Sequence, residues 1–226
     1  MILALGIAGG IPARPDAAGQ ATAGLGSLRG RVAIRRVVSA PVRRPGIADF
    51  GTSAQPDVPD LPPAIVFLES PDVPETSVLR SQPLAPGRAR MDQRNETFVP
   101  HVLAIDVGTR VDFPNNDQTF HNVFSLSKPR RFDLGRYGRN QSKTIRFDKP
   151  GVVRVFCDIH SHMNAFVVVF NHPYHALTDD DGRYRIDNIP AGTYGVTAWH
   201  EGSARDMRSV TIPPGGGVID LDLLVQ

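Results

Sequence analysis

Short apolar runs separated by turn residues set the pattern of this chain. In its central part, strands of alternating or continuous apolar residues are predicted at 101–107, 111–113, 120–124, 142–147, 152–157 and 164–170. Towards the two ends, further strands are predicted at 28–38, 64–68, 184–186, 194–199, 210–212 and 218–225. The polar, arginine-rich stretch 126–142 is predicted to be a long loop. Because no long stretch shows the periodicity of a helix, the chain is predicted to be all-β.

Composition agrees with this prediction and narrows the class of protein. The 21 glycines and 20 prolines supply turns, and 226 residues suffice for one large β domain or two small ones. A formal net charge of +2 is too small to predict that the whole molecule binds nucleic acid or a membrane surface. The single cysteine excludes an internal disulfide.

The first residues, 1–11, are apolar but too short to span a bilayer, which takes about 20 residues. With the small residues that follow, they are typical of the remainder of a secretory signal that lacks its positively charged start. We therefore expect residues 1–27 to be a signal remnant or disordered tail, and the protein to be periplasmic or secreted. The true N-terminus and the oligomeric state stay open.

The strongest chemical signal is a run of soft and borderline metal ligands. Cys157, the only cysteine, is followed three positions later by His160 and three further on by Met163. Copper prefers such thiolate, imidazole and thioether groups, and a His2Cys site with a weak axial Met is an electron-transfer arrangement. His121 can supply the second histidine. Each side chain alone has an ordinary structural explanation, but Cys-x2-His-x2-Met between two apolar strands favours a metal site.

These motifs carry a resemblance to a known family. The segment from 149 onward resembles the C-terminal ligand loop of plastocyanin-like cupredoxins, and most of all that of amicyanin, through Lys149, Pro150, Gly151, Phe156, Cys157, His160 and Met163. The same family's first half is matched in order by Phe98, Pro100, Gly108, Thr109, Val111, Phe113, Asn116, Asp117, His121, Asn122 and Val123. The resemblance implies a Greek-key β-sandwich over about 88–170 with one type 1 copper, held by His121, Cys157, His160 and Met163. It also implies that His160 is the ligand nearest the surface and that Asn122 ties the two ligand loops together by hydrogen bonds.

Some features leave alternatives open. His162 lies beside Met163 and could compete with it as a ligand, which would give a more tetragonal site. Met91 and His101 could form a second metal site, although each is expected on a strand face. The arginine-rich stretch 128–139 could dock an acidic partner, although a solvated loop is favoured slightly. A nitrosocyanin-like site with an open position is the alternative if Met163 does not coordinate.

A second resemblance concerns the two ends of the chain. The motifs Thr-Asp-x-Asp-Gly-Arg-Tyr at 178–184 and Ile-Pro-Ala-Gly-Thr-Tyr at 189–194 resemble the carboxypeptidase regulatory-like, transthyretin-related β-sandwich. Its two opening strands are matched near 28–32 and 63–66, before the cupredoxin-like part. We therefore expect a second small β-sandwich that is discontinuous. The expected division is 1–27 signal remnant, 28–70 plus 171–226 carboxypeptidase regulatory-like sandwich, 71–87 linker and 88–170 cupredoxin domain.

The expected function is that of an exported type 1 copper protein that carries single electrons between redox protein partners. An enzyme is not expected, because four ligands would saturate the metal and the sequence shows no Ser/His/Asp or paired-carboxylate arrangement. The similarity to amicyanin suggests methylamine utilisation by analogy only. The alternatives are a copper-handling protein without a redox partner and a structural β module with a vestigial site.

Overall fold

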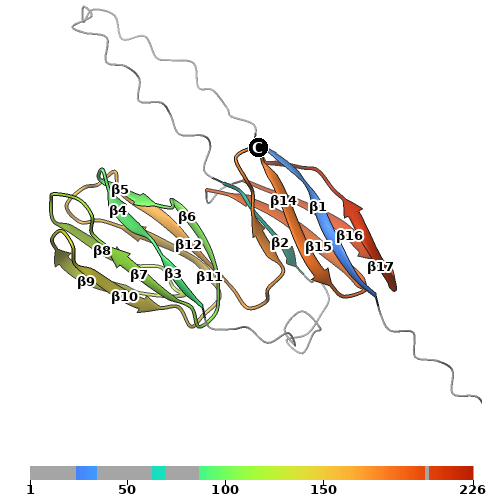
Figure 1. Ribbon diagram of the computed structural model, residues 1–226, viewed down its shortest axis with the longest axis horizontal. Helices are drawn as coiled ribbons and strands as arrows, with labels where there is room; N and C mark the ends of the chain where they lie inside the picture. The colour runs from blue at the N-terminus through green and yellow to red at the C-terminus, as the bar shows by residue number, and fades with distance from the viewer. Residues whose placement is uncertain (1–23, 35–62, 70–86, 202–203, 226) are drawn as a thin grey trace, which may run out of the picture.

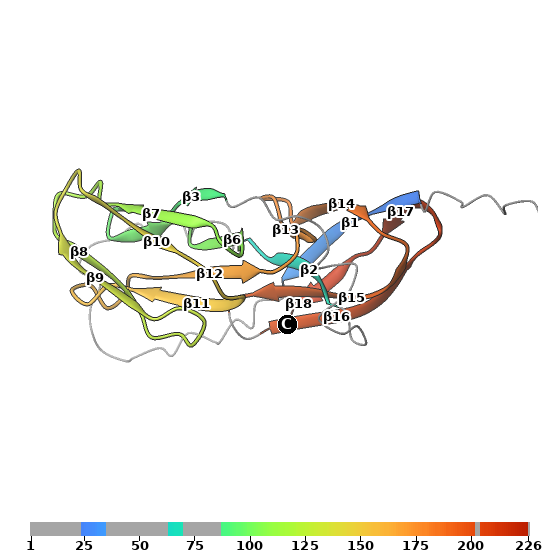
Figure 2. The ribbon, with the colours of Figure 1, turned by 90° about the horizontal axis from the view of Figure 1, so that it is seen from below.

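In the computed structural model, the described residues are 24–34, 63–69, 87–201 and 204–225. They form strands joined by turns and loops, and no helix occurs among them. Figures 1 and 2 show two β-sandwiches arranged along the long axis of the molecule. The prediction of an all-β chain with two sandwiches is confirmed. No helix in the described part is long and apolar enough to cross a membrane.

The first sandwich is built from the middle of the chain. Its larger sheet has the strand order β6-β12-β11-β8-β9, and a three-stranded sheet β10-β7-β3 and a hairpin β4-β5 accompany it. The strands are β3 (Arg88–Arg90), β4 (Asp92–Arg94), β5 (Thr97–Val99), β6 (Val102–Asp106), β7 (Arg110–Pro114), β8 (His121–Ser125), β9 (Phe132–Tyr137), β10 (Ser142–Arg146), β11 (Gly151–Phe156) and β12 (Asn164–Phe170).

Alternating side chains give this sandwich its core. Val111 and Phe113 of β7 are fully buried while Arg110 is exposed, and Val153 and Val155 of β11 are buried in the same cluster. Successive side chains of a strand point to opposite faces, so a period of two places one face in the core. β7 ends at Pro114, as expected for a residue that cannot donate to the ladder.

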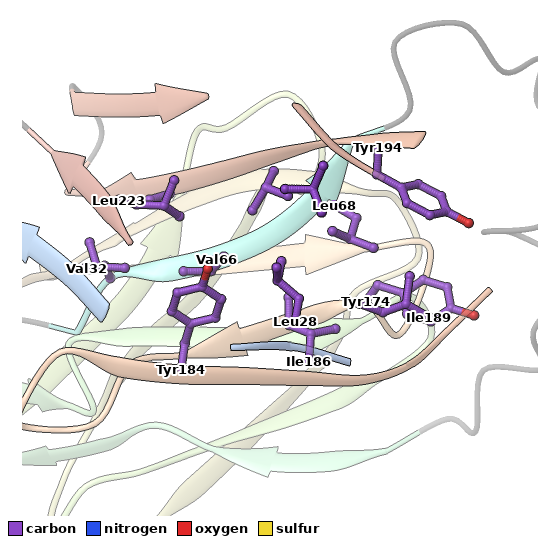
Figure 3. Close-up of a cluster of buried hydrophobic side chains, with 14 of the residues drawn as sticks. Leu28, Val32, Val66, Leu68, Tyr174, Tyr184, Ile186, Ile189, Tyr194 and Leu223 are labelled. Atoms are coloured by element: carbon purple, nitrogen blue, oxygen red, sulfur yellow. The ribbon is translucent and has the colours of Figure 1, made fainter. Parts of the chain in front are cut away.

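The second sandwich joins strands from both ends of the chain. Its sheets are β14-β1-β17, with β18 also paired to β1, and β13-β2-β15-β16. The strands are β1 (Gly24–Ile34), β2 (Ile65–Glu69), β13 (His175–Leu177), β14 (Arg183–Ile189), β15 (Gly192–His200), β16 (Ala204–Ile212), β17 (Gly215–Asp220) and β18 (Leu223–Val225). Figure 3 shows Leu28 and Val66, from the first part of the chain, packed with Ile186 and Leu223 from the last part. This sandwich is therefore discontinuous, as predicted.

Strand β12 is apolar on both faces because each face meets a different core. Val167 and Val169 lie in the core of the first sandwich, whereas Phe166, Val168 and Phe170 point to the other side. There they form a cluster between the sandwiches with Ile65, Val102 and Trp199. A strand that is buried on both faces has a continuous apolar sequence, which is the pattern of 164–170.

Two histidine–carboxylate pairs flank this cluster. His101 Nε2 lies 2.9 Å from Glu201 Oε1, and His175 Nε2 lies 2.9 Å from Asp106 Oδ1. In each pair one residue belongs to the first sandwich and the other to the second. The two sandwiches therefore share an apolar interface with polar contacts at its edges.

The prediction of a long polar loop at 126–142 is wrong. β9 pairs with β8 in antiparallel fashion and forms an edge of the larger sheet. Its alternation is hidden in the sequence by Gly135, which has a φ of 64°, and by charged neighbours. Tyr137 anchors the strand, because its buried hydroxyl donates a hydrogen bond of 2.7 Å to the Phe113 carbonyl. Half of the arginine-rich stretch 128–139 is thus an edge strand, with only Tyr137 of that strand fully buried.

At the start of the chain, the observed strand boundary differs from the predicted one. β1 begins at Gly24, four residues before the predicted start, and its glycines lie against β17. A Cβ on Gly24 would lie 2.4 Å from the Gly215 carbonyl oxygen, so this close pairing requires glycine although glycine is usually a sign of a turn. The rest of the expected signal remnant, 1–23, and all but Gly87 of the expected linker 71–87 lie outside the described residues.

Candidate metal centre

Three of the four predicted ligands converge at one end of the first sandwich. His121 begins β8, Cys157 directly follows β11, and His160 lies in the loop that leads to β12. Their donor atoms all lie within 4.8 Å of one another. His121 Nδ1 is 3.1 Å from His160 Nδ1, and Cys157 Sγ is 3.9 Å from each of these nitrogens. This is the one such group of histidine, cysteine or carboxylate side chains among the described residues.

The loop between β11 and β12 is closed by its own backbone. The Cys157 N–H donates to the Met163 carbonyl over 3.2 Å, and the Met163 N–H donates to the His160 carbonyl over 3.0 Å. β11 and β12 are paired up to the Phe156–Asn164 position, so the seven residues between them form a tight connection. The spacing Cys-x2-His-x2-Met therefore places all three side chains around one small turn.

Met163 lies at the base of this loop. Its side chain is 1% exposed and belongs to the same apolar cluster as Cys157. His162, in contrast, is 61% exposed, and its Nε2 lies 3.3 Å from Glu96 Oε2. The structure thus buries Met163 beside the cysteine and directs His162 towards a carboxylate on the surface.

His121 is oriented by a carboxylate on the far side of its ring. Its Nε2 lies 2.7 Å from Asp117 Oδ2 while its Nδ1 faces the cysteine and the other histidine. Partial burial acts to raise the pKa of Asp117, but hydrogen bonds from the Glu96 N–H, from His121 and from the Asn95 N–H outweigh it and lower the pKa. The ionised carboxylate accepts a hydrogen bond from the Nε2–H group of His121. The Nδ1 atom of the same ring therefore keeps a lone pair that can bind a metal ion.

Cys157 is held by a neighbouring backbone. The Asn122 N–H points at Cys157 Sγ over 3.5 Å, and an N–H directed at sulfur favours negative charge there. The Asn122 side chain makes a different contact, because its Nδ2 donates to Asp133 Oδ1 over 2.7 Å. Asn122 thus connects to the cysteine through its backbone and to β9 through its side chain. Hydrogen bonds from the Gly135 N–H and from Asn122 lower the pKa of Asp133.

The distances between the donors are short enough for one metal ion to contact all three. An ion about 2.0–2.1 Å from each nitrogen and about 2.3 Å from sulfur, the usual lengths for these ligands in zinc sites, could reach His121 Nδ1, His160 Nδ1 and Cys157 Sγ together. Two imidazoles and a thiolate are ligands that suit copper and zinc. The residues present therefore fit a metal ion of this kind.

Met91 and His101 take part in separate contacts. Met91 is fully buried in the core of the first sandwich. His101 faces the other sandwich, where it pairs with Glu201 and packs edge-on against Phe166.

Two carboxylates near the ligands were not singled out from the sequence. Asp117 was named only among the residues that carry the cupredoxin resemblance, with no role at the metal. Glu96 lies in the turn of the β4-β5 hairpin, more than twenty residues before the first ligand. The signal that could have pointed to Asp117 is its position four residues before His121. Nothing local in the sequence points to Glu96, because its proximity depends on how the hairpin packs.

One family model matches the last part of the chain. Residues 161–225, less than a third of the chain, match the family model of the carboxypeptidase regulatory-like domain. No curated protein matches the sequence.

Among solved structures, a copper-containing nitrite reductase from Thermus scotoductus is 28% identical over 38% of this chain and 22% of its own, with a TM-score of 0.35. A reduced amicyanin variant is 23% identical over 36% of this chain and 80% of its own, with a TM-score of 0.34. A purple cupredoxin from Nitrosopumilus maritimus is 22% identical over 36% of this chain and 99% of its own, with a TM-score of 0.34.

All three TM-scores lie below 0.5, and the match spans only about a fifth of the nitrite reductase, so these similarities establish no function. The chain is all-β, with one region similar to cupredoxins and another similar to the carboxypeptidase regulatory-like domain.

Proposed function

We propose that this chain is a type 1 copper protein that carries single electrons between redox partners. The observation that carries the proposal is the convergence of His121 Nδ1, Cys157 Sγ and His160 Nδ1, which lie 3.1–3.9 Å from one another. A trigonal His2Cys donor set with a weak axial thioether is the site that electron-transfer copper proteins use. Met163, buried at the base of the same loop, would supply the thioether.

When bound, copper would supply the one-electron chemistry, cycling between Cu(I) and Cu(II). The residues of the chain keep the donors in one arrangement. Cys157 is fixed by the Met163 carbonyl and the Asn122 N–H, and His121 is fixed by Asp117. A site that is held by its surroundings in this way needs little rearrangement when its charge changes.

His160 is the proposed route for the electron. Its side chain is 18% exposed, whereas that of His121 is completely buried. Phe120 and Ile159, which precede the two histidine ligands, are exposed apolar side chains. An apolar surface beside a partly exposed ligand suits brief contact with a partner protein, which is the usual mode of redox encounters.

The proposal includes export and the absence of an enzymatic activity. His121 and Cys157 are buried, as is Met163 in the same apolar cluster, which supports a carrier rather than a site that is open to a substrate. The export part rests on the apolar residues 1–11 of the sequence, which lie outside the described residues.

A redox titration of the copper-loaded protein tests the proposal. We expect a reversible one-electron transition whose potential shifts in Met163→Leu and stays unchanged in Met207→Leu, since Met207 is 58% exposed in the other sandwich. Absence of a reversible transition in a protein that binds one copper ion would contradict electron transfer.

Copper handling without a redox partner is a second candidate function. It is favoured by exposed His162 and Glu96 beside His160, which could receive or pass on a metal ion. Tight copper binding without a reversible transition, together with rapid transfer of Cu(I) to a chelator that slows in His162→Ala, would support this alternative.

A further inference from the structure

One buried contact of the metal centre lies outside the set of metal donors. Asp117, in the loop between β7 and β8, has a side chain that is only 12% exposed. Its Oδ2 accepts from His121 Nε2 over 2.7 Å and from the Glu96 N–H over 2.9 Å, and its Oδ1 accepts from the Asn95 N–H. The carboxylate therefore joins a metal-facing histidine to the turn of the β4-β5 hairpin.

The hairpin turn is shaped to hold this carboxylate. Asn95 and Glu96 are its two central residues and have φ values of 53° and 51°, which is the left-handed region of a type I′ turn. Glutamate is uncommon there, since only glycine, asparagine and aspartate adopt it easily. The two N–H groups of this turn both point at Asp117, so the unfavourable backbone is offset by two charge-assisted hydrogen bonds.

Further contacts fix the hairpin to the loop that carries Asp117. Asn116 Nδ2 donates to Asp92 Oδ1 over 2.6 Å, and the Asn116 N–H donates to the Gln93 carbonyl over 2.9 Å. Asn115 forms an isolated bridge with Gln93. Asp117 is thus positioned by the packing of β4 and β5 and not by its own loop alone.

We propose that Asp117 is a positioning residue of the metal centre, which holds the Nε2 proton of His121 and thereby sets the donor strength of His121 Nδ1. This inference rests on the proposed function. A carboxylate bound to the outer N–H of a ligating histidine fixes its tautomer and increases its basicity. A more basic nitrogen with a negative charge behind it favours Cu(II) over Cu(I), so Asp117 lowers the reduction potential of the site.

The other histidine has a weaker contact of the same kind, which provides a control. His160 Nε2 lies 3.8 Å from Glu96 Oε1, beyond hydrogen-bonding distance, and Glu96 is about half exposed. The charge of Glu96 is therefore screened by solvent. Glu96→Gln removes a charge near the site without removing a hydrogen bond to a ligand, which makes it the matched control for Asp117→Asn.

The first test needs no copper. In the metal-free protein the two Nδ1 atoms are 3.1 Å apart, so one of them must carry a proton that the other accepts. If Asp117 holds the Nε2 proton of His121, then His160 donates from Nδ1. Nitrogen NMR of the wild-type histidines at pH 8 should show the Nε2–H tautomer for His121, and a mixture of tautomers in Asp117→Asn. An Nδ1–H tautomer for His121 in the wild-type protein would overturn the inference, even if the variant failed to fold.

The second test is the potential of the copper-loaded protein. Loss of an outer hydrogen-bonding partner typically weakens metal binding by about 10–100-fold. If Asp117→Asn lowers the affinity for Cu(II) relative to Cu(I) about tenfold, the potential rises by about 59 mV. Glu96→Gln should change the reduction potential much less. Asp117→Glu keeps a carboxylate and should raise the potential less than Asp117→Asn does.

These two tests separate the inference from the proposed function. A wild-type protein that binds no copper would contradict the proposed function, while the tautomer of His121 would still decide the role of Asp117. Equal potentials in wild type and Asp117→Asn, or equal shifts in Asp117→Asn and Glu96→Gln, would overturn the inference while electron transfer stood.

Discussion

Replacement of Leu28 by alanine tests whether the start of the chain is an integral part of the second sandwich. Leu28 is fully buried, pairs with Ile186 across β1 and β14, and packs in the core shown in Figure 3. If β1 completes this core, the variant should lose much of the stability of a sandwich whose other strands, apart from β2, follow some 150 residues later.

The expected magnitude follows from the buried volume that is removed. Leu→Ala deletes three carbon groups at about 0.8 kcal/mol each, so the transfer contribution is about 2–3 kcal/mol. The cavity left behind brings the usual total for such a substitution to about 3–5 kcal/mol. Leu25, on the same strand but 56% exposed, is the matched control, and Leu25→Ala should cost less than about 0.5 kcal/mol.

Urea denaturation measures both variants. Trp199 is the only tryptophan of the chain and is 3% exposed at the contact between the sandwiches, so its fluorescence reports on the loss of that contact. Circular dichroism reports on the strands, and coincidence of the two curves would justify a two-state treatment. Equal losses for Leu28→Ala and Leu25→Ala would refute the placement of β1 in the core.

Two further predictions concern the first sandwich. Tyr137→Phe removes a buried hydroxyl that donates to the Phe113 carbonyl and accepts from Gln93 Nε2, each over 2.7 Å. Loss of these two hydrogen bonds should cost about 1–3 kcal/mol in urea denaturation, and an unchanged midpoint would contradict the anchoring of β9. Asp112 accepts from Arg88 and Thr144 on the two neighbouring strands, and these bonds lower its pKa. Its contribution to stability is therefore present at neutral pH and lost as the pH falls below about 4. Asp112→Asn should flatten the loss of stability in acid, and an identical pH profile for both proteins would contradict this.

The sequence allowed a sound prediction of the fold class because most strands show their period locally. β7 and β11 alternate, and β12 is continuously apolar since it is buried on both faces. β9 was missed because a glycine at positive φ and several charged residues interrupt its alternation. Its place in the sheet depends on pairing with β8, which no local pattern reveals.

The residues of the candidate site also differ in how far the sequence could predict them. Cys157, His160 and Met163 could be chosen from their spacing alone because one short loop carries them, and His121 followed from the need for a second imidazole. Asp117 could not be assigned a role, since its hydrogen bonds to the β4-β5 turn and to His121 arise only when distant strands pack. The discontinuous second sandwich likewise required a resemblance, because the strands at 24–34 and 65–69 carry no local sign of their later partners.

The visible and EPR spectra of the protein with one equivalent of Cu(II) test the central claim most directly. A His2Cys site gives intense visible absorption through its copper–thiolate bond, so the wild-type protein should be strongly coloured with a narrowed copper hyperfine splitting. Cys157→Ser should lose the colour, while Met207→Leu should keep it. A colourless wild-type protein with an ordinary copper EPR spectrum would contradict a copper centre at His121, Cys157 and His160.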